Sequence, residues 1–391
     1  MIDALSRFAR QSGVAISVKA DQLKGLQTPG LTGSYSIEAG FATLLAGSGY
    51  QIRKTDAGYV LQQAPIVTGQ TLPMMTISTA VDSLKQGKAE EGYRVSNISG
   101  VGPWGQRSLQ DTPYSMNVVS EELIKNLQAY SSPDEVFKIN PVIQFGWPSA
   151  QGDQANIYMR GFETRTVARN GLSRQGFNYA HGIIMEEVAR VEVLTGLSGF
   201  LYGAGNVGGI VNYVTKRPTQ QRLNSITLGN TAGQNLYAHG DFGGRFGTNN
   251  TFGYRINAAV QDGETQIKHT DLERWSVSGL FDWQIADNLL IEFDLSKRNY
   301  RFEGRNATWS LASGVSRPDA DDIDADISWG QKWSFLDMQT ERLGVNLYWD
   351  ISDHLRFRTS FLNEENTRSW SSANNEIQTD GTYNQSIYYL P

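Results

Sequence analysis

The sequence predicts a small α+β module, then a mixed α/β domain, then an antiparallel β-sheet that forms part of a transmembrane barrel. Three patterns in the 391 residues lead to this fold class. Helical and strand spacings of apolar residues alternate in residues 1–63, and short strands and helices mix in residues 91–218. In residues 219–391 apolar and polar residues alternate with a period of two.

The composition excludes several classes of protein. With 34 Lys and Arg against 40 Asp and Glu, the net charge is -6, so we expect no nucleic-acid partner, which would need a basic surface. The absence of cysteine excludes disulfide frameworks, thiolate metal sites and cysteine nucleophiles. No apolar run reaches the roughly 18 residues of a transmembrane helix.

The first residues, Met1-Ile2-Asp3-Ala4-Leu5, contain neither the basic nor the apolar part of a signal peptide. Either the chain stays in the cytoplasm or its export signal is missing from this sequence.

The N-terminal module contains two helix–strand units. Leu5, Phe8 and Ala9 have helical spacing. Ser36 is suited to cap a second helix, and Asp56-Ala57-Gly58 predicts a hairpin turn between two strands. We expect a docking domain, because the module contains no group of polar residues suited to catalysis.

Residues 64–90 lose both periodicities and are rich in Thr, Ser, Gly and Pro, as is typical of a linker. One β-prone run within them is centred on Met75, Thr76, Ile77 and Ser78. An extended run of this kind is suited to strand addition on a partner's open sheet edge. An ordinary linker is the alternative.

The middle region, residues 91–218, contains two predicted helices between short strands. Ser120 followed by Glu121 and Glu122 is typical of a helix N-terminus. A second helix is expected after Pro133, where proline is well tolerated in a first turn.

A glycine-rich run ends the middle region and formally matches a dinucleotide-binding fingerprint through Gly203, Gly205 and Gly208. That fingerprint requires a helix after the glycines, whereas residues 210–214 favour a strand. We therefore expect these glycines, together with Gly209, to allow close approach of backbones rather than to hold a nucleotide.

The third region has one apolar, aromatic face and one polar or charged face, as residues 252–261 show. A soluble sandwich would bury the apolar face, so alternation alone does not separate a sandwich from a barrel. The connections favour a barrel. Turns near 286–288 and 351–353 are short, and those near 300–340 and 364–384 are expected to be long, as in outer-membrane barrels.

Two segments resemble known modules of bacterial envelope proteins. Residues 1–63 resemble the STN domain of secretins and signalling receptors, through the runs Leu31-Thr32-Gly33-Ser34-Tyr35-Ser36 and Leu44-Leu45-Ala46-Gly47-Ser48-Gly49-Tyr50. The run centred on Met75 to Ser78 looks like a TonB box.

Residues 91–218 resemble the plug domain of TonB-dependent siderophore receptors. The matching motifs are Asp111-Thr112-Pro113, Asn140-Pro141, Arg160-Gly161-Phe162, Arg190-Val191-Glu192-Val193 and the run from Leu201 to Pro218. Residues 219–391 would then be the N-terminal part of the β-barrel.

The resemblance implies an outer-membrane receptor and active transporter for ferric siderophores, not an enzyme, with no cofactor and no resident metal. TonB, energised by the ExbB/ExbD complex, would pair with the TonB box. The STN domain would lie in the periplasm and contact an anti-sigma factor, and outer-membrane lipid would surround the barrel.

The family's ligand rests on plug loops that face outward. By position, the candidate ligand-binding residues are Phe145, Trp147, Glu163, Arg165, Phe177 and Tyr179. Aromatic rings and a cation suit a polar, often anionic chelate. Packing against the barrel wall is an equal alternative for Trp147 and Phe177, and Arg160 is expected to form an ion pair between plug and barrel.

Two other functions remain open. The same architecture carries haem, cobalamin or oligosaccharides in other receptors, and a periplasmic signalling or interaction protein could combine STN and plug with a small sheet domain. After Pro218 only 391 − 218 = 173 residues remain, enough for about seven or eight of the ~22 strands of a plugged barrel. We therefore expect the sequence to be truncated in the barrel.

Overall fold

A computed structural model gives the fold and divides the chain into two compact units, Met1–Pro73 and Met74–Pro391. It describes residues 2–18, 23, 28, 30–31, 36–45, 48, 50–55, 58–63, 87–98, 107–130, 132–147, 156–164, 167–174, 183–197, 201, 207–231 and 233–391. In this described part of the chain, no helix is long and apolar enough to cross a membrane.

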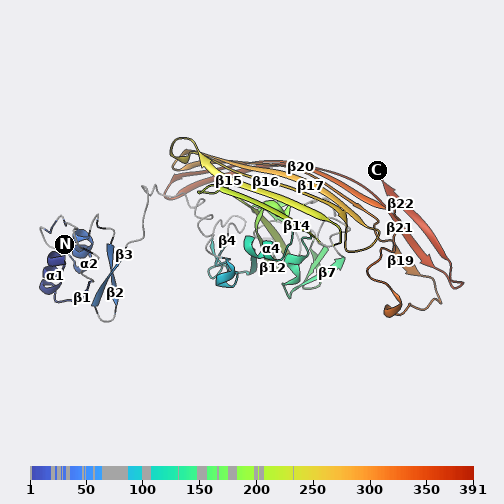
Figure 1. Cartoon of the computed structure of the whole chain (residues 1–391), viewed down its shortest axis with the longest axis horizontal. Coiled ribbons are helices and arrows are strands. Elements are labelled where there is room, and N and C mark those ends of the chain that lie inside the picture. The colour runs from blue at the N-terminus through green and yellow to red at the C-terminus, as the bar shows by residue number, and fades with distance from the viewer. Residues whose placement is uncertain are drawn as a thin grey trace. The chain divides into compact units, whose positions relative to one another are not determined.

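The first unit contains a three-stranded sheet and two helices (Figure 1). Its elements are α1 (Ile2–Gln11), β1 (Ile16–Ser17), α2 (Ile37–Leu44), β2 (Tyr50–Thr55) and β3 (Gly58–Gln63). The central strand β3 pairs with β1 in parallel and with β2 in the predicted hairpin. The Ser36 side chain accepts a hydrogen bond from the Ala39 backbone N–H and caps α2, as the sequence predicts. Phe41 is fully buried in the core.

The second unit begins with the plug-like region, whose elements are short. They are η3 (Ala89–Glu91), β4 (Asn97–Ile98), β5 (Arg107–Ser108), β6 (Ser115–Ser120), α4 (Glu121–Asn126), α5 (Glu135–Lys138), β7 (Ile143–Trp147), β8 (Asn156–Met159), β9 (Phe162–Thr164), β10 (Val167–Arg169), β11 (Leu172–Arg174), η6 (Met185–Glu187), β12 (Val188–Thr195) and β13 (Gly209–Thr215). Ser120 caps α4 by accepting from Leu123 N–H, which confirms the predicted helix start.

A five-stranded sheet of order β11-β10-β13-β12-β6 forms the centre of the plug-like region. Val119, Val191 and Val211 lie in its core with almost no exposed surface. β13 follows the glycine run directly and is a strand along its whole length. No helix is therefore available there to bind a pyrophosphate, and the dinucleotide interpretation is excluded.

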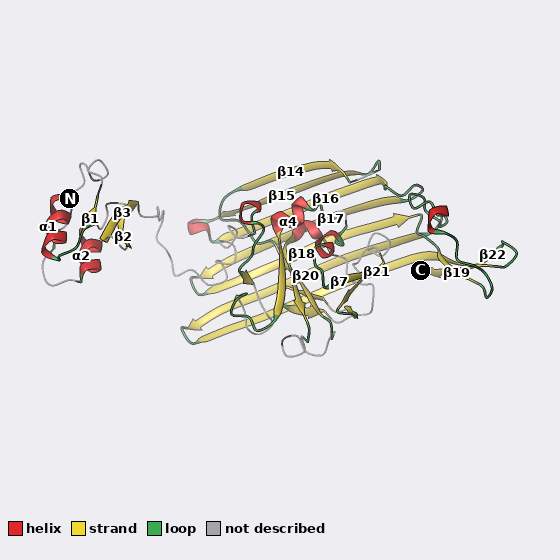
Figure 2. Ribbon diagram, turned by 90° about the horizontal axis from the view of Figure 1, so that it is seen from below, coloured by secondary structure: helices red, strands yellow, loops and turns green. Residues whose placement is uncertain are grey.

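The C-terminal part of the second unit is a nine-stranded sheet, called here the large sheet (Figure 2). Its strands are β14 (Leu223–Asn230), β15 (Leu236–Phe246), β16 (Phe252–Glu264), β17 (Asp271–Ala286), β18 (Leu289–Glu303), β19 (Thr308–Leu311), β20 (Phe335–Ser352), β21 (Leu355–Ile377) and β22 (Tyr383–Leu390), with short 3₁₀ turns η7 (Thr248–Asn250) and η8 (Ala320–Asp322). All pair antiparallel with their neighbours except β19, which runs parallel to the end of β21.

The two faces of the large sheet are buried in the opposite sense to those of a soluble protein. On the outer face, apolar side chains are open to the surroundings, with Leu228 76% and Val277 49% exposed. On the inner face, polar side chains are buried, with Asn257 2% and Ser278 1% exposed. This distribution agrees with the predicted barrel wall, which places apolar residues toward lipid and polar residues toward the interior.

The connections agree with the prediction at all but one place. The turns at 287–288 and 353–354 are short, and residues 304–334 form a long connection with only β19 and η8 in it. The long connection expected near 364–384 is wrong, because β21 continues to Ile377 and only residues 378–382 join it to β22. Residues 363–368 lack apolar alternation, yet backbone pairing with β20 keeps them in the strand.

Candidate functional site

The proposed ligand-binding residues are only partly in the described region. Phe145 lies on β7 and packs, half-buried, against the core of the plug-like region. Glu163 lies on β9, and the two strands flank β8 in one small sheet. Trp147 ends β7, where its backbone pairs with Asn156.

The other predicted positions lie outside the described residues. They are Arg165, Phe177 and Tyr179 of the ligand site, Met75, Thr76, Ile77 and Ser78 of the TonB box, and Gly203 and Gly205 of the glycine run.

The motif Arg160-Gly161-Phe162 forms the turn between β8 and β9. Arg160 and Gly161 both have positive φ, 52° and 84°, and Phe162 is 51% exposed. The Arg160 side chain is also exposed. The ion pairs that the structure describes between the plug-like region and the large sheet use other cations, among them Arg169 and Arg217.

Gly208 and Gly209 lie where strands approach most closely. A Cβ on Gly208 would stand 2.6 Å from the Met159 carbonyl oxygen, and one on Gly209 would stand 2.2 Å from that of Leu194. Gly209 also has a φ of 149°, which side chains rarely permit. Both positions therefore require glycine.

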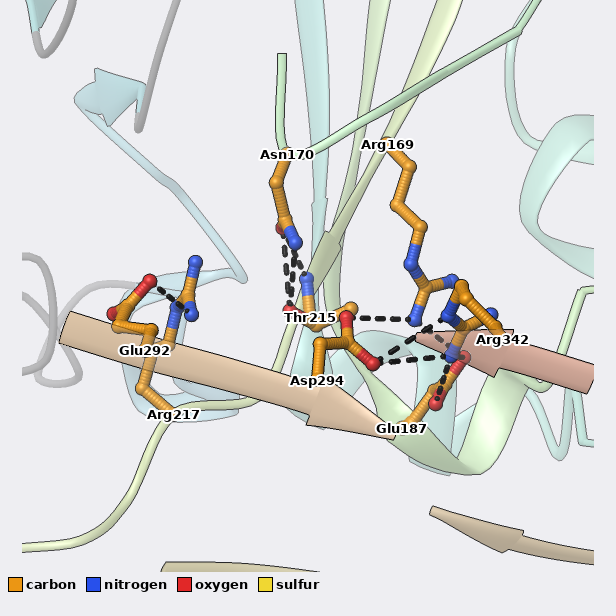
Figure 3. Close-up of polar contacts among 8 residues, drawn as sticks. All are labelled: Arg169, Asn170, Glu187, Thr215, Arg217, Glu292, Asp294 and Arg342. Carbon is orange, nitrogen blue, oxygen red and sulfur yellow. Dashed lines mark hydrogen bonds and ion pairs between the residues drawn. The ribbon is translucent and has the colours of Figure 1, made fainter. Parts of the chain in front are cut away.

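A buried group of four charged side chains joins the plug-like region to the large sheet (Figure 3). Glu187 of η6 accepts from Arg169 at 2.7 Å and from Arg342 of β20 at 2.8 Å. Asp294 of β18 lies 3.5 Å from Arg169 and 3.4 Å from Arg342. All four side chains are at most 5% exposed. Two cations and two anions balance, as burial of charge requires.

Glu186, the neighbour of Glu187, contacts two other strands of the large sheet. Arg274 of β17 donates to its Oε1 atom at 2.8 Å, and the hydroxyl of Tyr237 on β15 donates to the same atom at 3.2 Å. Burial alone would raise the pKa of Glu186, but the ion pair and hydrogen bond with Arg274 outweigh it and lower the pKa. Glu186 is therefore ionised at neutral pH.

A third contact involves α4 and the end of the plug-like region. Lys216 lies 2.9 Å from Asp241 of β15 and 3.3 Å from Glu121 of α4. Arg255 of β16 donates to Asp241 at 2.7 Å. Next along the chain, Arg217 pairs with Glu292 of β18 at 2.6 Å (Figure 3).

These contacts make the interface between the plug-like region and the inner face of the large sheet largely ionic. Sequence analysis missed them, because it assigned the ion pair to Arg160 and left Glu186 and Glu187 without a role. The signal was an acidic pair between the apolar residues Met185 and Val188. Two carboxylates in a buried run need cationic partners, and only the fold reveals which.

Comparison with known families matches both N-terminal regions of the chain. Residues 14–64 match the family described as "Secretin and TonB N terminus short domain", and residues 108–210 match "TonB-dependent Receptor Plug Domain".

Curated relatives and solved structures agree with these matches. The ferric-pyoverdine 358 receptor of Pseudomonas putida is 24% identical over 78% of this chain and 37% of its own length. The ferripyoverdine receptor of Pseudomonas aeruginosa is 21% identical over 88% of this chain and 42% of its own length. The crystal structure of BauA, the ferric preacinetobactin receptor of Acinetobacter baumannii, is 26% identical with a TM-score of 0.68, over 75% of this chain and 44% of that one.

The chain thus spans less than half the length of the curated relatives that it matches. TonB-dependent receptors are transporters and receptors rather than enzymes. The order of the two domain matches, the sheet that follows them and the receptor relatives together make the chain similar to TonB-dependent receptors that carry an N-terminal STN domain.

Proposed function

We propose that the chain works in the outer membrane as a receptor that takes up ferric siderophores with energy delivered by TonB. The main support for this proposal is the burial pattern of the large sheet. Apolar side chains such as Leu228 and Val277 face outward, and the polar face covers the plug-like region. Such a wall is stable in lipid and would be costly in water.

The ionic interface suits a plug that must stay in place until TonB acts on it and must then move. A tightly packed apolar interface would lose its contacts outright on opening, whereas water can replace the partners of Glu187 and Asp241 once it enters. TonB, energised by ExbB/ExbD, would pair with the TonB box at residues 75–78 and pull on the chain that leads to Gly87. The hydroxyl of Ser120 donates to the Gly87 carbonyl at 2.7 Å, so a pull there would reach α4 and the Glu121 contact.

The transported ligand in this proposal is a ferric siderophore, held by plug loops and released without chemical change. The relatives named above are receptors for ferric siderophores. We propose Phe145, Trp147, Glu163, Arg165, Phe177 and Tyr179 as ligand contacts, since aromatic faces and a cation suit an anionic chelate. Replacing Arg165 with Ala should weaken binding, and unchanged affinity would remove it from the site.

The STN unit would add signalling from the periplasm. In the described residues β2 is an edge strand of the small sheet, and an anti-sigma factor is the partner we propose for this unit.

Uptake of radiolabelled iron tests the proposed function. Cells that depend on the full-length gene product should accumulate iron from one member of a panel of ferric siderophores, and deletion of TonB should abolish accumulation. Uptake of haem, cobalamin or an oligosaccharide in place of every siderophore would contradict the assigned substrate. Accumulation that persists without TonB would contradict the coupling.

A further inference from the structure

Two arginines share one aromatic ring on the inner face of the large sheet, at the end with the long 304–334 connection. The guanidinium Cζ atoms of Arg305 and Arg368 lie 5.3 and 5.9 Å from the ring centroid of Trp370. Trp370 packs against a buried apolar cluster that includes Phe302 and Leu336. The ring is therefore fixed, and both cations are held close to it and to each other.

The charge on Arg305 is poorly compensated. Its Nε and Nη1 atoms are buried and make no hydrogen bond in the structure. Burial and then the like charge of Arg368 lower the pKa of Arg305 to about 10. The side chain stays protonated at neutral pH, so the site keeps a half-buried cation with two buried, unused donors. Such a group is costly unless another molecule supplies an acceptor.

The backbone at Arg305 is held in place by the long connection. The Ser334 hydroxyl donates to the Arg305 carbonyl oxygen at 2.8 Å, and the Ser328 hydroxyl donates to that of Gly304 at 2.7 Å. Gly330 packs so closely that a Cβ there would stand 1.8 Å from the Arg305 carbonyl oxygen. These contacts fix the backbone of Arg305, and its guanidinium lies over the Trp370 ring. A side chain placed in this way favours a binding site over a mobile surface arginine.

One further cation and one carboxylate lie on the inner face near this pair. The Arg298 guanidinium, on β18, lies 5.2 Å from the ring centroid of Tyr300 and is 4% exposed. A carboxylate, Glu364, points to the same face two residues before Asn366, whose amide donates to it. The charge interactions of Arg305 itself are with Arg368 and Tyr300.

We propose that Arg305 and Arg368, supported by Trp370, bind negatively charged oxygens of the ferric chelate, so that the receptor prefers anionic chelates to neutral ones. This inference rests on the proposed function and names the class of substrate. An anionic oxygen would accept from the unused Arg305 donors and relieve the repulsion between the two guanidinium groups. Tris-catecholate complexes of iron are strongly anionic, whereas in a trihydroxamate the ligand charges cancel that of the iron.

The test compares binding of a radiolabelled ferric tris-catecholate and a ferric trihydroxamate to de-energised cells that display the full-length gene product. Arg305→Gln and Arg368→Gln should each weaken binding of the tris-catecholate by about tenfold, the loss expected for a charge-assisted hydrogen bond. Binding of the trihydroxamate should change little. Arg305→Lys should restore only part of the affinity, because lysine keeps the charge but not the planar donor group.

Arg301→Gln is the matched control. Arg301 stands near the same end of β18 but on the outer face, where it pairs with Glu303 and Asp337. The Arg301→Gln substitution removes the same charge as Arg305→Gln, and it should leave the affinities for both chelates unaltered. Equal effects of Arg301→Gln and Arg305→Gln, or wild-type preference for the neutral chelate, would overturn the inference.

Energised uptake separates this inference from the proposed function. Uptake that depends on TonB but is insensitive to Arg305→Gln would refute the subsite and keep the function. Binding that depends on Arg305 without TonB-dependent accumulation would keep the subsite and refute the function. Binding of neither chelate would refute the subsite.

Discussion

The Nη2 nitrogen of Arg342 on β20 lies 2.8 Å from both carboxylate oxygens of Glu187, and neither side chain is exposed. The two residues are separated by 155 positions in the sequence. Their contact fastens the plug-like region to the large sheet at a point that water does not reach. It is one of several buried ion pairs that hold that region against the sheet.

Removing the charge of Glu187 should loosen the plug-like region. In Glu187→Gln, Arg169 and Arg342 would face Asp294 alone, and a buried cation would be left without a full partner. We expect the free energy of unfolding to fall by about 3 kcal/mol. Urea unfolding of the purified full-length protein would measure the loss, and hydrogen exchange in β12 would locate it.

Glu135→Gln provides the control for that variant. Glu135 pairs with Lys138 on the surface, where the two side chains are 33% and 57% exposed. An exposed pair of this kind contributes less than about 1 kcal/mol. Equal losses for the two variants would contradict a special role for the buried group.

The pH dependence of the Glu186 contact follows from its lowered pKa. A carboxylate whose pKa is lower in the folded state stabilises the fold above its usual value of 4.5, and this stabilisation disappears as the pH falls through the folded value. The difference in unfolding free energy between wild type and Glu186→Gln should be constant near neutral pH and shrink in acid below 4.5. A difference that shrinks at about pH 6 to 8, where carboxylates do not ordinarily titrate, would instead point to another titrating group.

Glycine at position 209 should be required for packing of the plug-like region. In Gly209→Ala the new methyl group would meet the Leu194 carbonyl oxygen and the sulfur of Met159, in a backbone conformation with φ 149°. We expect a loss of about 2 kcal/mol or more. Gly229→Ala on β14 adds the same methyl group in open space, and thermal unfolding should separate the two variants; similar melting temperatures would refute the packing argument.

A charge on the outer face of the large sheet should impair insertion into lipid. Leu295 on β18 is 45% exposed on that face. Near the middle of the bilayer, Leu295→Arg should lower the stability of the folded barrel in lipid by about 2–4 kcal/mol. Ser316→Arg adds the same charge in the exposed 304–334 connection and should be neutral. The fraction of folded protein recovered in outer membranes would measure both, and normal recovery of Leu295→Arg would mean that this face does not contact lipid.

Much of the fold could be predicted from local patterns. Ser36 and Ser120 predicted the starts of α2 and α4, because a capping side chain acts within three residues of its own position. The two faces of the large sheet followed from alternation, since neighbouring residues of a strand point to opposite sides. The length of β21 did not follow, because its second half has no apolar period and depends on pairing with β20 and β22.

The ionic interface could not be predicted in the same way. Motif resemblance singled out Arg160, whereas burial and register bring Arg169, Glu187 and Arg342 together from three distant segments. The local sequence shows an acidic pair, Glu186-Glu187, between apolar residues, but it does not show which cations pair with it. The inward charges on the strands were visible, but their partners on the plug-like region depend on how that region lies against the sheet.

Deletion of residues 74–79 tests TonB-coupled transport most directly. Cells that express the full-length gene product with this deletion should bind the radiolabelled ferric siderophore as wild type does but should not accumulate it. Binding on ice and energised uptake would be measured on the same cells. Wild-type uptake by the deletion variant would contradict the account, because transport would then proceed without the segment through which TonB is proposed to act.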